Sequence, residues 1–547
     1  MIRITNFNVP FHDMSPLPEL AARRLNLPPQ AVPEVVIVRK AVDARRYKGA
    51  PIQFVYVLDV KVKGSEKAVL AHFRRDKNIA LKKAEPQQAV AFSARGNQLR
   101  PVVMGFGPAG MFAALTLARA GWQPLVLERG QDVDQRHAAI DRFWQRGILD
   151  ERSNVQFGEG GAGTFSDGKL TTRINDSSMA AVLEAFVAAG APEEIRYLHK
   201  PHIGTDLLRD IVKNIRQEII RLGGAVRFAA QVTDLECRDG QLQAVIVNGE
   251  ERIAAGNLFM GIGHSARDTY AMLYGKGFPM EAKAFAMGVR IEHPQEFIDR
   301  AQYGEDAGQP ALPVADYALT YKDAVSGRGA YSFCMCPGGQ VVAAASEAGG
   351  VVTNGMSNYH RDSGIANAAL LVTVTPQDFG SGVLSGMEFQ RQCEAAAFRA
   401  AGSDYYAPVQ TVGDFLAGRH GSREFLTTPT YAPGVRPVDL RQCLPSFLTD
   451  VLARALPYFD RKIPGFAHPG VPMTGVETRS SAPCRILRNR ETFLSLGMAG
   501  VYPIGEGAGY AGGIMSAAVD GRNAALAFLQ KNGHTINDKE INATIKL

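Results

Sequence analysis

The pattern of apolar and polar positions changes near residue 96 and divides the chain into two parts. The first part contains predicted strands and one helix, at residues 2–9, 34–40, 52–62 and, for the helix, 17–25. The segment 52–62 alternates apolar and polar side chains and is rich in Val, Tyr and Phe, which is typical of a half-buried strand. We therefore predict a small α+β domain in residues 1–95, with the polar segment 94–98 as its boundary.

After this boundary, strands alternate with glycine turns and helices, which predicts an α/β fold. An apolar strand at 102–104 leads into a helix with small residues on one face, from Gly110 to Gly121, and a second strand follows at 124–127. Later segments predict an amphipathic helix from residue 205, a strand through Val232, strands at 241–247 and 257–260, and a strand with a last helix within 500–529.

The segment between these groups predicts an inserted α+β domain. It contains expected strands at 286–292 and 340–346 and expected helices at 388–401 and 445–456. We therefore expect four further regions: a first nucleotide-binding part at 96–280, a substrate or cap domain at 281–470, a returning part at 471–530 and a C-terminal tail at 531–547.

Glycines follow the strand at 102–104 in the spacing G-x-G-x-x-G. The first glycine permits a tight turn, the second lets a pyrophosphate approach the backbone, and the third lets the helix pack closely on the strand. The free N–H groups of the helix N-terminus would point at the phosphates. The predicted binding loop consists of Gly105, Phe106, Gly107, Pro108, Ala109 and Gly110.

An acidic residue ends the second strand. Glu128 stands 18 residues after Gly110, where a carboxylate can accept hydrogen bonds from both hydroxyls of an adenosine ribose. The strand, glycine turn, small-residue helix, second strand and acid occur in this order, which favours a dinucleotide site over a plain glycine turn. We include the adjacent Arg129 in the predicted site.

Six further segments resemble those of the bacterial uncharacterised FAD-dependent dehydrogenase family, a group of two-dinucleotide-binding-domain flavoproteins distantly similar to geranylgeranyl reductases. They are NVQFGEGGAGTFSDGKLTTR (154–173), KPHIGTD (200–206), GIGHSARD (261–268), FCMCPGG (333–339), GVETRSSAPCRI (475–486) and PIGEGAGYAGGI (503–514). The resemblance covers roughly residues 100–530. It implies FAD as cofactor and a Rossmann-like FAD-binding domain with an inserted substrate or cap domain, and it leaves the substrate open.

The resemblance also implies FAD contacts beyond the first motif. In that family an acid after the returning strand contacts the ribityl chain, and Glu506 stands here where Asp is usual. The next helix N-terminus faces the flavin N1–O2 edge, where its dipole favours the negative charge of reduced flavin. The contacts expected from these distant segments are Val232, Gly263, Glu506, Gly507, Gly512, Gly513 and Ile514.

Two other glycine runs imitate the dinucleotide motif. The run at 158–163 precedes turn formers and not a helix, so we interpret it as a backbone loop around the flavin or its pyrophosphate, with a surface loop as the alternative. Its predicted contacts are Gly160, Gly161, Ala162, Gly163 and Thr164. The run at 261–266 follows a strand, but no βαβ unit with a suitable acid comes after it. We assign it to the return turn of the FAD domain, which makes NAD(P)H a candidate transient donor without a domain of its own.

Three residues are catalytic candidates: Lys169, Glu477 and Arg479. Lys169 could stabilise reduced flavin or an anionic substrate, or it could be a solvent-facing loop lysine. In an extended segment Glu477, Arg479 and Arg485 would share one face. A carboxylate between two guanidiniums is either a structural ion pair or a site for anion binding and proton transfer.

Cys334 and Cys336 are close enough in sequence to interact. On a regular strand they would share a face with Cα atoms ~6.6 Å apart, near the limit for a disulfide. The pattern favours small buried residues lining the cap, with a redox dithiol as the alternative. His199 and His202 have no carboxylate or cysteine set nearby, so no metal site is predicted.

Composition limits the class of protein to which the chain can belong. The 547 residues are 46% hydrophobic and 21% charged, which is typical of globular proteins. Six cysteines are too few for a disulfide scaffold, and the chain has neither an apolar export signal nor ~20 consecutive apolar residues. We therefore expect a cytoplasmic protein without a membrane span.

The charge is unevenly distributed along the chain. The first 100 residues contain 18 Lys and Arg against 8 Asp and Glu, a balance of +10, whereas the remainder has a balance of −4. This pattern favours the solvated face of a small domain, with a nucleic-acid or acidic partner bound through residues 1–95 as the alternative. The basic residues concerned are Arg39, Lys40, Arg45, Arg46, Lys48, Arg74, Arg75, Lys82 and Lys83.

The sequence thus predicts an FAD-dependent oxidoreductase that passes electrons between tightly bound FAD and an unidentified small-molecule substrate. The alternatives are an NAD(P)H-dependent reductase with a donor site of its own, an RNA-associated flavoprotein and a flavoprotein without turnover. Hydrolase and kinase motifs such as H-E-x-x-H, the Walker loop and G-x-S-x-G are absent from the sequence. The oligomeric state is not predicted.

Overall fold

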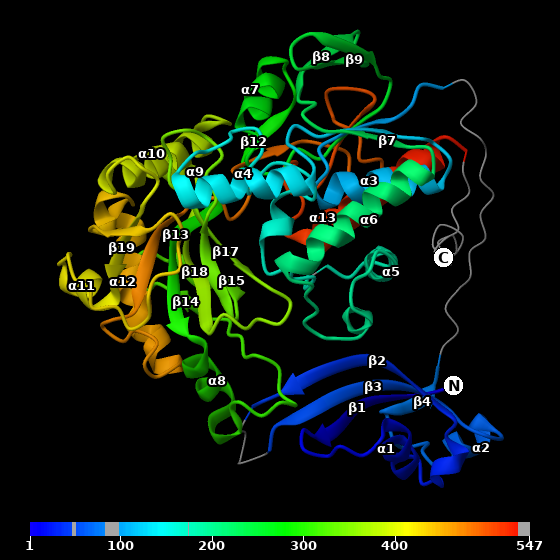
Figure 1. The fold of residues 1–547 in the computed structure, drawn as a ribbon. Coiled ribbons are helices and arrows are strands. Elements are labelled where there is room, and N and C mark those ends of the chain that lie inside the picture. Colours follow the sequence, from blue (N-terminus) through cyan, green and yellow to red (C-terminus); the bar gives the residue numbers. More distant parts are fainter. Residues whose placement is uncertain (46–50, 83–97, 173, 534–547) are drawn as a thin grey trace.

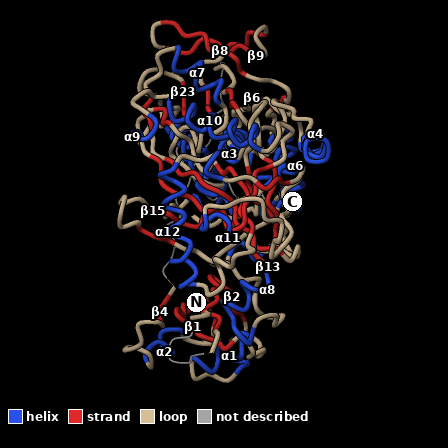
Figure 2. Tube along the Cα trace, turned by 90° about the vertical axis from the view of Figure 1, so that its left-hand side faces the viewer, coloured by secondary structure: helices blue, strands red, loops and turns tan. Residues whose placement is uncertain are grey.

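The computed structural model describes residues 1–45, 51–82, 98–172 and 174–533. Figure 1 shows a small N-terminal unit below a larger body, and Figure 2 shows the same separation from the side. Residues 94–97 of the predicted boundary lie outside the described residues, and only residue 98 is described. The predicted tail lies outside them from residue 534 onward. Arg46, Lys48 and Lys83 of the basic segment also lie outside them.

The N-terminal unit is a four-stranded antiparallel sheet, in the order β2-β3-β1-β4, with two helices. Its elements are β1 (Ile2–Pro10), α1 (Leu17–Arg24), β2 (Glu34–Asp43), β3 (Gln53–Lys61), α2 (Glu66–Ala71) and β4 (Ile79–Leu81). Alternate side chains of β3, such as Phe54, Tyr56 and Leu58, are buried in one core with Leu20 of α1. The strands and the helix expected from the alternating pattern are therefore present.

Five parallel strands form the centre of the larger body, in the order β23-β11-β5-β6-β7. They are β5 (Val102–Met104), β6 (Leu125–Leu127), β7 (Ala225–Arg227), β11 (Leu258–Met260) and β23 (Val501–Pro503). Helix α3 (Pro108–Arg119) packs beside α6 (Thr205–Arg221) and α13 (Ile514–Lys531), and α5 (Ser178–Ala188) contacts α13 (Figure 1). This α/β arrangement brings the loops after β5, β11 and β23 to one edge of the sheet.

The expected strand through Val232 is wrong in its extent. Strand β7 ends at Arg227, and β8 (Val232–Arg238) begins a separate antiparallel sheet with β9 (Gln241–Val247) and β10 (Glu251–Ala254). Between them Ala229 has a φ of 50°, so the chain turns out of the parallel sheet. Helices α4 (Val133–Arg146) and α7 (Arg267–Gly275) complete this part of the body.

The cap is built around a seven-stranded sheet in the order β14-β15-β18-β13-β21-β19-β20. The strands are β13 (Phe285–Pro294), β14 (Thr320–Lys322), β15 (Gly329–Cys336), β18 (Ile365–Val374), β19 (Ala407–Thr411), β20 (Val435–Pro437) and β21 (Pro472–Glu477). Its helices are α8 (Gln295–Tyr303), α9 (Pro376–Phe379), α10 (Ser385–Ala400), α11 (Val412–Ala417) and α12 (Ser446–Lys462). Two strand pairs lie beside this sheet: β16 (Gly339–Ala343) with β17 (Thr353–Ser357), and β12 (Met280–Ala282) with β22 (Cys484–Ile486).

The cap differs in extent from the prediction. The strand expected at 340–346 ends at Ala343, and the helix expected at 445–456 continues to Lys462. Strand β21 pairs with β13 in the centre of the cap sheet, so the cap continues past residue 470, where the sequence placed its end. Strand β13 is buried along nearly its whole length because neighbouring strands and helices cover it. Within the described ranges, none of the helices is both long and apolar enough to cross a membrane.

Candidate functional site

A cavity of about 370 Å³ lies where the carboxyl ends of the parallel strands meet the cap. Its walls come from the loops after β5, β6, β11 and β23, from the segment 156–171, and from the cap around Cys334, Asn354 and Arg479. Ligands of open α/β sheets bind at this edge. Most of the residues that the sequence predicted as FAD contacts line this one cavity: Gly105, Gly107, Pro108, Ala109, Glu128, Arg129, Gly161, Ala162, Gly163, Val232, Gly263, Glu506, Gly512, Gly513 and Ile514.

The first glycine loop requires residues without side chains. Gly105 has a φ of 90°, and a Cβ there would lie 2.4 Å from the carbonyl oxygen of Gly261. A Cβ at Gly110 would lie 1.9 Å from the carbonyl oxygen of Gly105. Helix α3 begins at Pro108, so its first N–H groups are directed toward the cavity that Gly107 lines. The loop is therefore shaped to bring backbone, and not side chains, to a bound group.

Glu128 is fixed at the cavity edge by backbone donors. Its carboxylate accepts hydrogen bonds from the N–H groups of Phe106 at 2.7 Å and of Gly130 and Gly158 at 2.9 Å. The adjacent Arg129 stacks over the Phe157 ring, with 4.4 Å between guanidinium carbon and ring centroid. Glu128 thus joins the first glycine loop to the loop at 158–163, and both residues line the cavity.

The loop at 158–163 packs against the first glycine loop. The N–H of Gly160 donates to the carbonyl of Phe106 at 2.9 Å, and a Cβ at Gly161 would lie 2.9 Å from the Cα of Gly107. After it comes a short 3₁₀ turn, Ala162–Phe165, and no long helix, as the sequence indicated. The turn at 261–266 follows β11, which lies between β5 and β23, so it belongs to the same sheet as the first motif.

Five predicted contacts do not line the cavity and act as supports instead. The Phe106 side chain is buried in the core beneath the loop, and the Thr164 side chain is buried beside Gly160. Gly507 lies against the backbone of Gly263, and its carbonyl accepts a hydrogen bond from Tyr270 Oη at 2.7 Å. Close packing against neighbouring residues keeps these groups out of the cavity wall. The five are Phe106, Gly110, Gly160, Thr164 and Gly507.

Burial shifts the pKa values of Glu506 and His264, which both line the cavity. Burial raises the pKa of Glu506 to about 7, although the nearby Lys283 opposes this shift. Burial, assisted by the charges of Arg479 and Arg267, lowers the pKa of His264 to about 3, so its imidazole is neutral at neutral pH. Sequence reasoning missed His264, because a histidine in a glycine turn carries no signal of its own.

The expected face of Glu477, Arg479 and Arg485 does not form. Strand β21 ends at Glu477 and Arg485 lies in β22, which belongs to a different sheet, so the alternation cannot continue between them. Glu477 instead accepts two hydrogen bonds from Arg290, from Nε to Oε2 and from Nη2 to Oε1, both at 3.0 Å. Arg485 pairs with Glu281 at 2.7 Å. Only Glu477 and Arg479 line the cavity.

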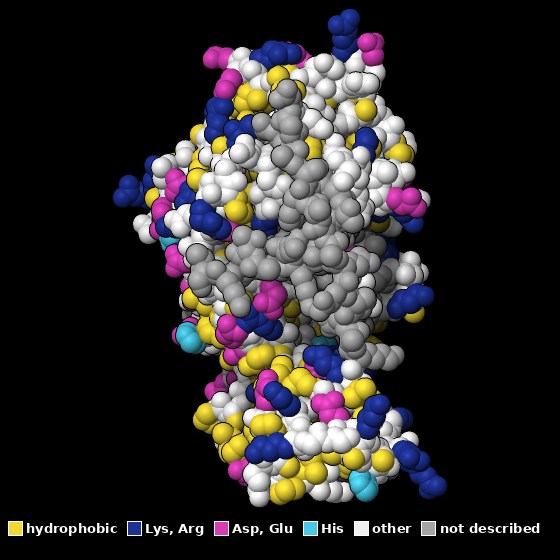
Figure 3. All heavy atoms as spheres, turned by 90° about the vertical axis from the view of Figure 1, so that its right-hand side faces the viewer, with side chains coloured by type: hydrophobic (Ala, Val, Ile, Leu, Met, Phe, Trp, Pro, Cys, Tyr) yellow, Lys and Arg dark blue, Asp and Glu magenta, His cyan; other side chains and the backbone are white. Residues whose placement is uncertain are grey.

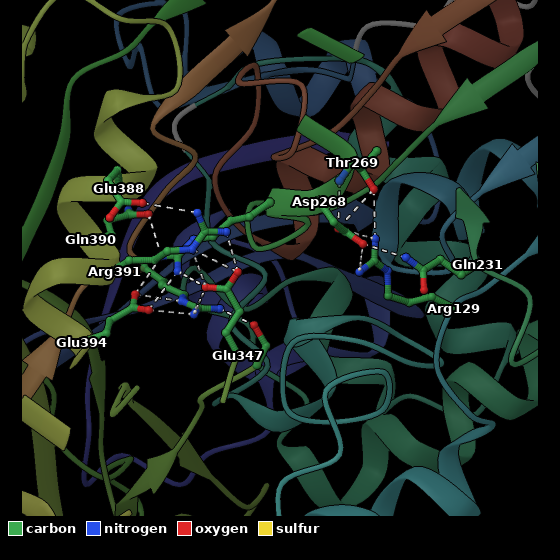
Figure 4. A network of polar contacts seen from close by, with 12 residues as sticks. Arg129, Gln231, Asp268, Thr269, Glu347, Glu388, Gln390, Arg391 and Glu394 are labelled. Atoms are coloured by element: carbon green, nitrogen blue, oxygen red, sulfur yellow. Dashed lines mark hydrogen bonds and ion pairs between the residues drawn. The ribbon is translucent and has the colours of Figure 1, made fainter. Parts of the chain in front are cut away.

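Arg479 belongs to a buried network between the α/β body and the cap. Figure 4 labels the two acidic members of this network, Glu347 and Glu394. Glu394 of α10 binds Arg479 at 2.9 Å and Arg267 of α7 at 2.8 Å. Burial would raise the pKa of Glu394, but the charges of these two arginines outweigh it and hold that pKa well below its usual range. Glu347 adds a second carboxylate, 2.5 Å from Arg267. The network fixes the orientation of the cap over the cavity.

Lys169 lines the cavity, and its ammonium group donates a hydrogen bond to the carbonyl of Met335 in the cap. This contact excludes the alternative of a purely solvent-facing lysine. His199 contacts Arg39 and His202 contacts the carbonyl of Tyr359, so the two histidines serve different contacts. Among the described residues, no group of three or more His, Cys, Asp or Glu side chains could hold a metal ion.

Comparisons with known proteins agree with this geometry. Residues 284–480 match the family described as "FAD-dependent protein, C-terminal domain-like". A Clostridium beijerinckii protein, named "Uncharacterized protein", is 48% identical over 532 residues, which are 97% of this chain and 99% of that protein.

Several solved structures show a more distant likeness. CtdE in complex with FAD is 11% identical, with 82% of this chain and 88% of that chain covered and a TM-score of 0.31. The halogenase PltM is 10% identical, with 81% and 72% covered and a TM-score of 0.37. Glycine oxidase from Bacillus cereus is 8% identical, with 80% and 96% covered and a TM-score of 0.32. On the sequence matches, the chain belongs to one family with its Clostridium beijerinckii relative, and its residues 284–480 carry the domain described as "FAD-dependent protein, C-terminal domain-like".

Proposed function

We propose that the cavity binds FAD and that the protein is an oxidoreductase, which passes electrons between tightly bound FAD and an unidentified small molecule. The observation that carries this proposal is that one cavity joins the first glycine loop, Glu128 and the N-terminus of α13. These features suit the pyrophosphate, the adenosine ribose and the flavin ring of one FAD molecule.

The cavity wall fits a flat ring system and a pyrophosphate. A Cβ at Gly263, Gly512 or Gly513 would meet no heavy atom within 4 Å, although all three glycines line the cavity. A Cβ at Gly107 would lie 3.6 Å from the Cα of Gly161, its one near neighbour. Side chains at these positions would fill the space that the bound group needs, so the glycines form a cradle.

FAD supplies hydride and electron transfer when it is bound. Within the chain, the first N–H groups of α3 would hold the pyrophosphate and Glu128 would accept hydrogen bonds from the ribose. The N-terminus of α13 would favour negative charge at the nearest edge of the ring. The backbone thus carries most of the cofactor binding.

The cap supplies the polar side of the cavity, where we place the substrate. Lys169 brings positive charge to that side, which favours an anionic group, whereas Arg479 is paired with Glu394. Glu506 can hold or release a proton near neutral pH, because burial raises its pKa to about 7. Glu477 is neutralised by Arg290, so we assign it to positioning and not to proton transfer.

The proposal is tested by the visible spectrum of the purified, FAD-incubated protein under anaerobic conditions, before and after addition of NADPH or NADH. We expect a flavin band. Its bleaching would make the protein a reductase supplied by a nicotinamide, and an unbleached band that an organic substrate reduces would make it a dehydrogenase. A protein that retains no flavin would contradict the proposal.

Nucleic-acid binding through the N-terminal unit has less support. The backbone of Lys40 exchanges hydrogen bonds with Tyr197 and His199, so this part of the basic segment joins the unit to the main body. Figure 3 shows Lys and Arg side chains of the unit spread among acidic and apolar ones on the face in view. RNA retention that survives moderate salt and is lost on deletion of residues 1–95 would favour this alternative.

A further inference from the structure

Two cysteines lie where the cap sheet meets the cavity. The pairing of β15 with β18 shifts between Phe333 and Cys336, so three steps along β15 match two along β18. Cys334, inside this bulge, has a φ of 41°. The bulge interrupts the regular strand, in which positions two apart lie ~6.6 Å apart, near the limit for a disulfide. The side chains of Cys334 and Cys336 interact with each other.

The two thiols have different surroundings. Cys334 is half-buried and lines the cavity, whereas Cys336 is fully buried and does not line it. The Cys336 thiol lies 3.2 Å from the carbonyl oxygen of Cys334, to which it donates. One residue of the pair therefore lines the cavity, and the other is buried.

Two cations approach the bulge. Arg290 donates to the carbonyl of Cys334 at 2.9 Å, and Lys169 donates to the carbonyl of Met335. The side-chain interaction with Cys336, together with the charges of Arg290 and Lys169, lowers the pKa of Cys334 to about 6. The same interaction raises the pKa of Cys336 well above its usual value. A thiolate beside a protonated thiol is the resting form of a reactive dithiol.

We propose that Cys334 and Cys336 form a dithiol–disulfide pair that exchanges two electrons with the flavin bound in the cavity. This inference rests on the proposed function, because it requires FAD at this site. In the oxidising direction the Cys334 thiolate and the Cys336 thiol form one S–S bond, and the S–H bond of Cys336 breaks. The proton and two electrons pass to oxidised FAD, and the reverse step opens the disulfide at the expense of reduced FAD.

The pair is a second two-electron redox couple in addition to the flavin. Cys334 is the sulfur that faces the cavity, and Cys336 is the sulfur that closes the disulfide. When the disulfide opens, the positive charges of Arg290 and Lys169 beside the bulge stabilise the thiolate that forms.

An anaerobic titration of the air-oxidised holoprotein with dithionite tests the pair. We expect the wild-type protein to consume about two equivalents per flavin, and Cys334→Ser and Cys336→Ser to consume about one, since each couple takes two electrons. In parallel, peptide mapping of the alkylated wild-type protein should find both cysteines in one peptide that is lighter by two hydrogens. That peptide should become alkylated after reduction.

Cys237→Ser is the matched control, because Cys237 lies on β8 and does not line the cavity. It should consume two equivalents, like the wild-type protein. Consumption of one equivalent by the wild-type protein, with both thiols alkylated in the oxidised state, would overturn the pair. A disulfide that persists while the flavin is fully reduced would also overturn it. Failure of the proposed function has another signature, the absence of a flavin band from wild-type and variant proteins alike.

Discussion

The two walls of the cavity are built in different ways. The wall from the α/β body is mainly backbone, with Gly105, Gly107, Gly512 and Gly513 in glycine-rich turns. The wall from the cap consists of charged and thiol side chains that come together only through long-range pairing of strands and helices. The comparison indicates that cofactor binding is encoded locally, whereas the chemistry next to the cofactor depends on how the cap is assembled.

The largest expected effect concerns the network that holds the cap wall. Glu394→Gln removes the carboxylate between Arg267 and Arg479 and leaves two buried guanidiniums with only Glu347 nearby. We expect the free energy of unfolding to fall by about 3–5 kcal/mol, as for other buried pairs that lose one partner. Chemical denaturation of the variant and the wild-type protein measures the difference.

Glu388→Gln is the control for this prediction, because it lies on the same helix, α10, and its side chain is 58% exposed. Its contact with Arg391 should contribute less than about 1 kcal/mol. Equal losses for the two variants would show that the buried network is not what stabilises the cap.

The next effect concerns the backbone wall. Gly512 has no heavy atom within 4 Å of its Cβ position, so Gly512→Phe should fold normally and fill the cavity. We expect FAD affinity to fall by at least about a hundredfold, or about 3 kcal/mol, with an unchanged melting temperature of the FAD-free protein. Equilibrium dialysis against FAD measures this loss.

Gly256→Ala serves as the matched control, since Gly256 also has open space at its Cβ position but does not line the cavity. It should bind FAD like the wild-type protein. Full FAD retention by Gly512→Phe would show that the segment around Gly512 does not contribute to FAD binding.

A smaller effect is expected from Glu506. Burial raises the pKa of this carboxyl from 4.5 to about 7 in the folded protein. Between these two pH values the folded state therefore holds a proton that the unfolded state has released. Stability therefore falls as the pH rises from about 4.5 to about 7. Glu506→Gln removes this contribution. The melting temperature of the FAD-free variant minus that of the FAD-free wild-type protein should increase as the pH rises from about 4.5 to about 7. A constant difference over this pH range would contradict the raised pKa of Glu506.

The first glycine loop and the strands and helix around it could be predicted from the sequence because their signals are local. Gly105, Gly110 and Glu128 lie within one strand–helix–strand unit, and the steric reasons for the glycines hold wherever that unit occurs. Glu506 and Gly512 needed a family resemblance, because a second glycine turn alone does not indicate which sheet it joins.

The cap wall could not be predicted in this way. Alternation placed Glu477 beside Arg479 and Arg485, but the strand ends at Glu477, and its partner Arg290 is 187 positions away in sequence. The bulge that turns Cys334 toward the cavity follows from the register between β15 and β18, which alternation within one strand does not show. Side-chain chemistry that depends on register remains hidden until the sheet is assembled.

The most direct test of how the two walls meet is an experimental structure of the protein with FAD bound. The account predicts one FAD molecule in the cavity, with its adenosine ribose at Glu128, its pyrophosphate at the N-terminus of α3 and its ring between Gly513 and the face that carries Lys169 and Cys334. FAD bound elsewhere, or with its ring directed away from Cys334, would contradict it.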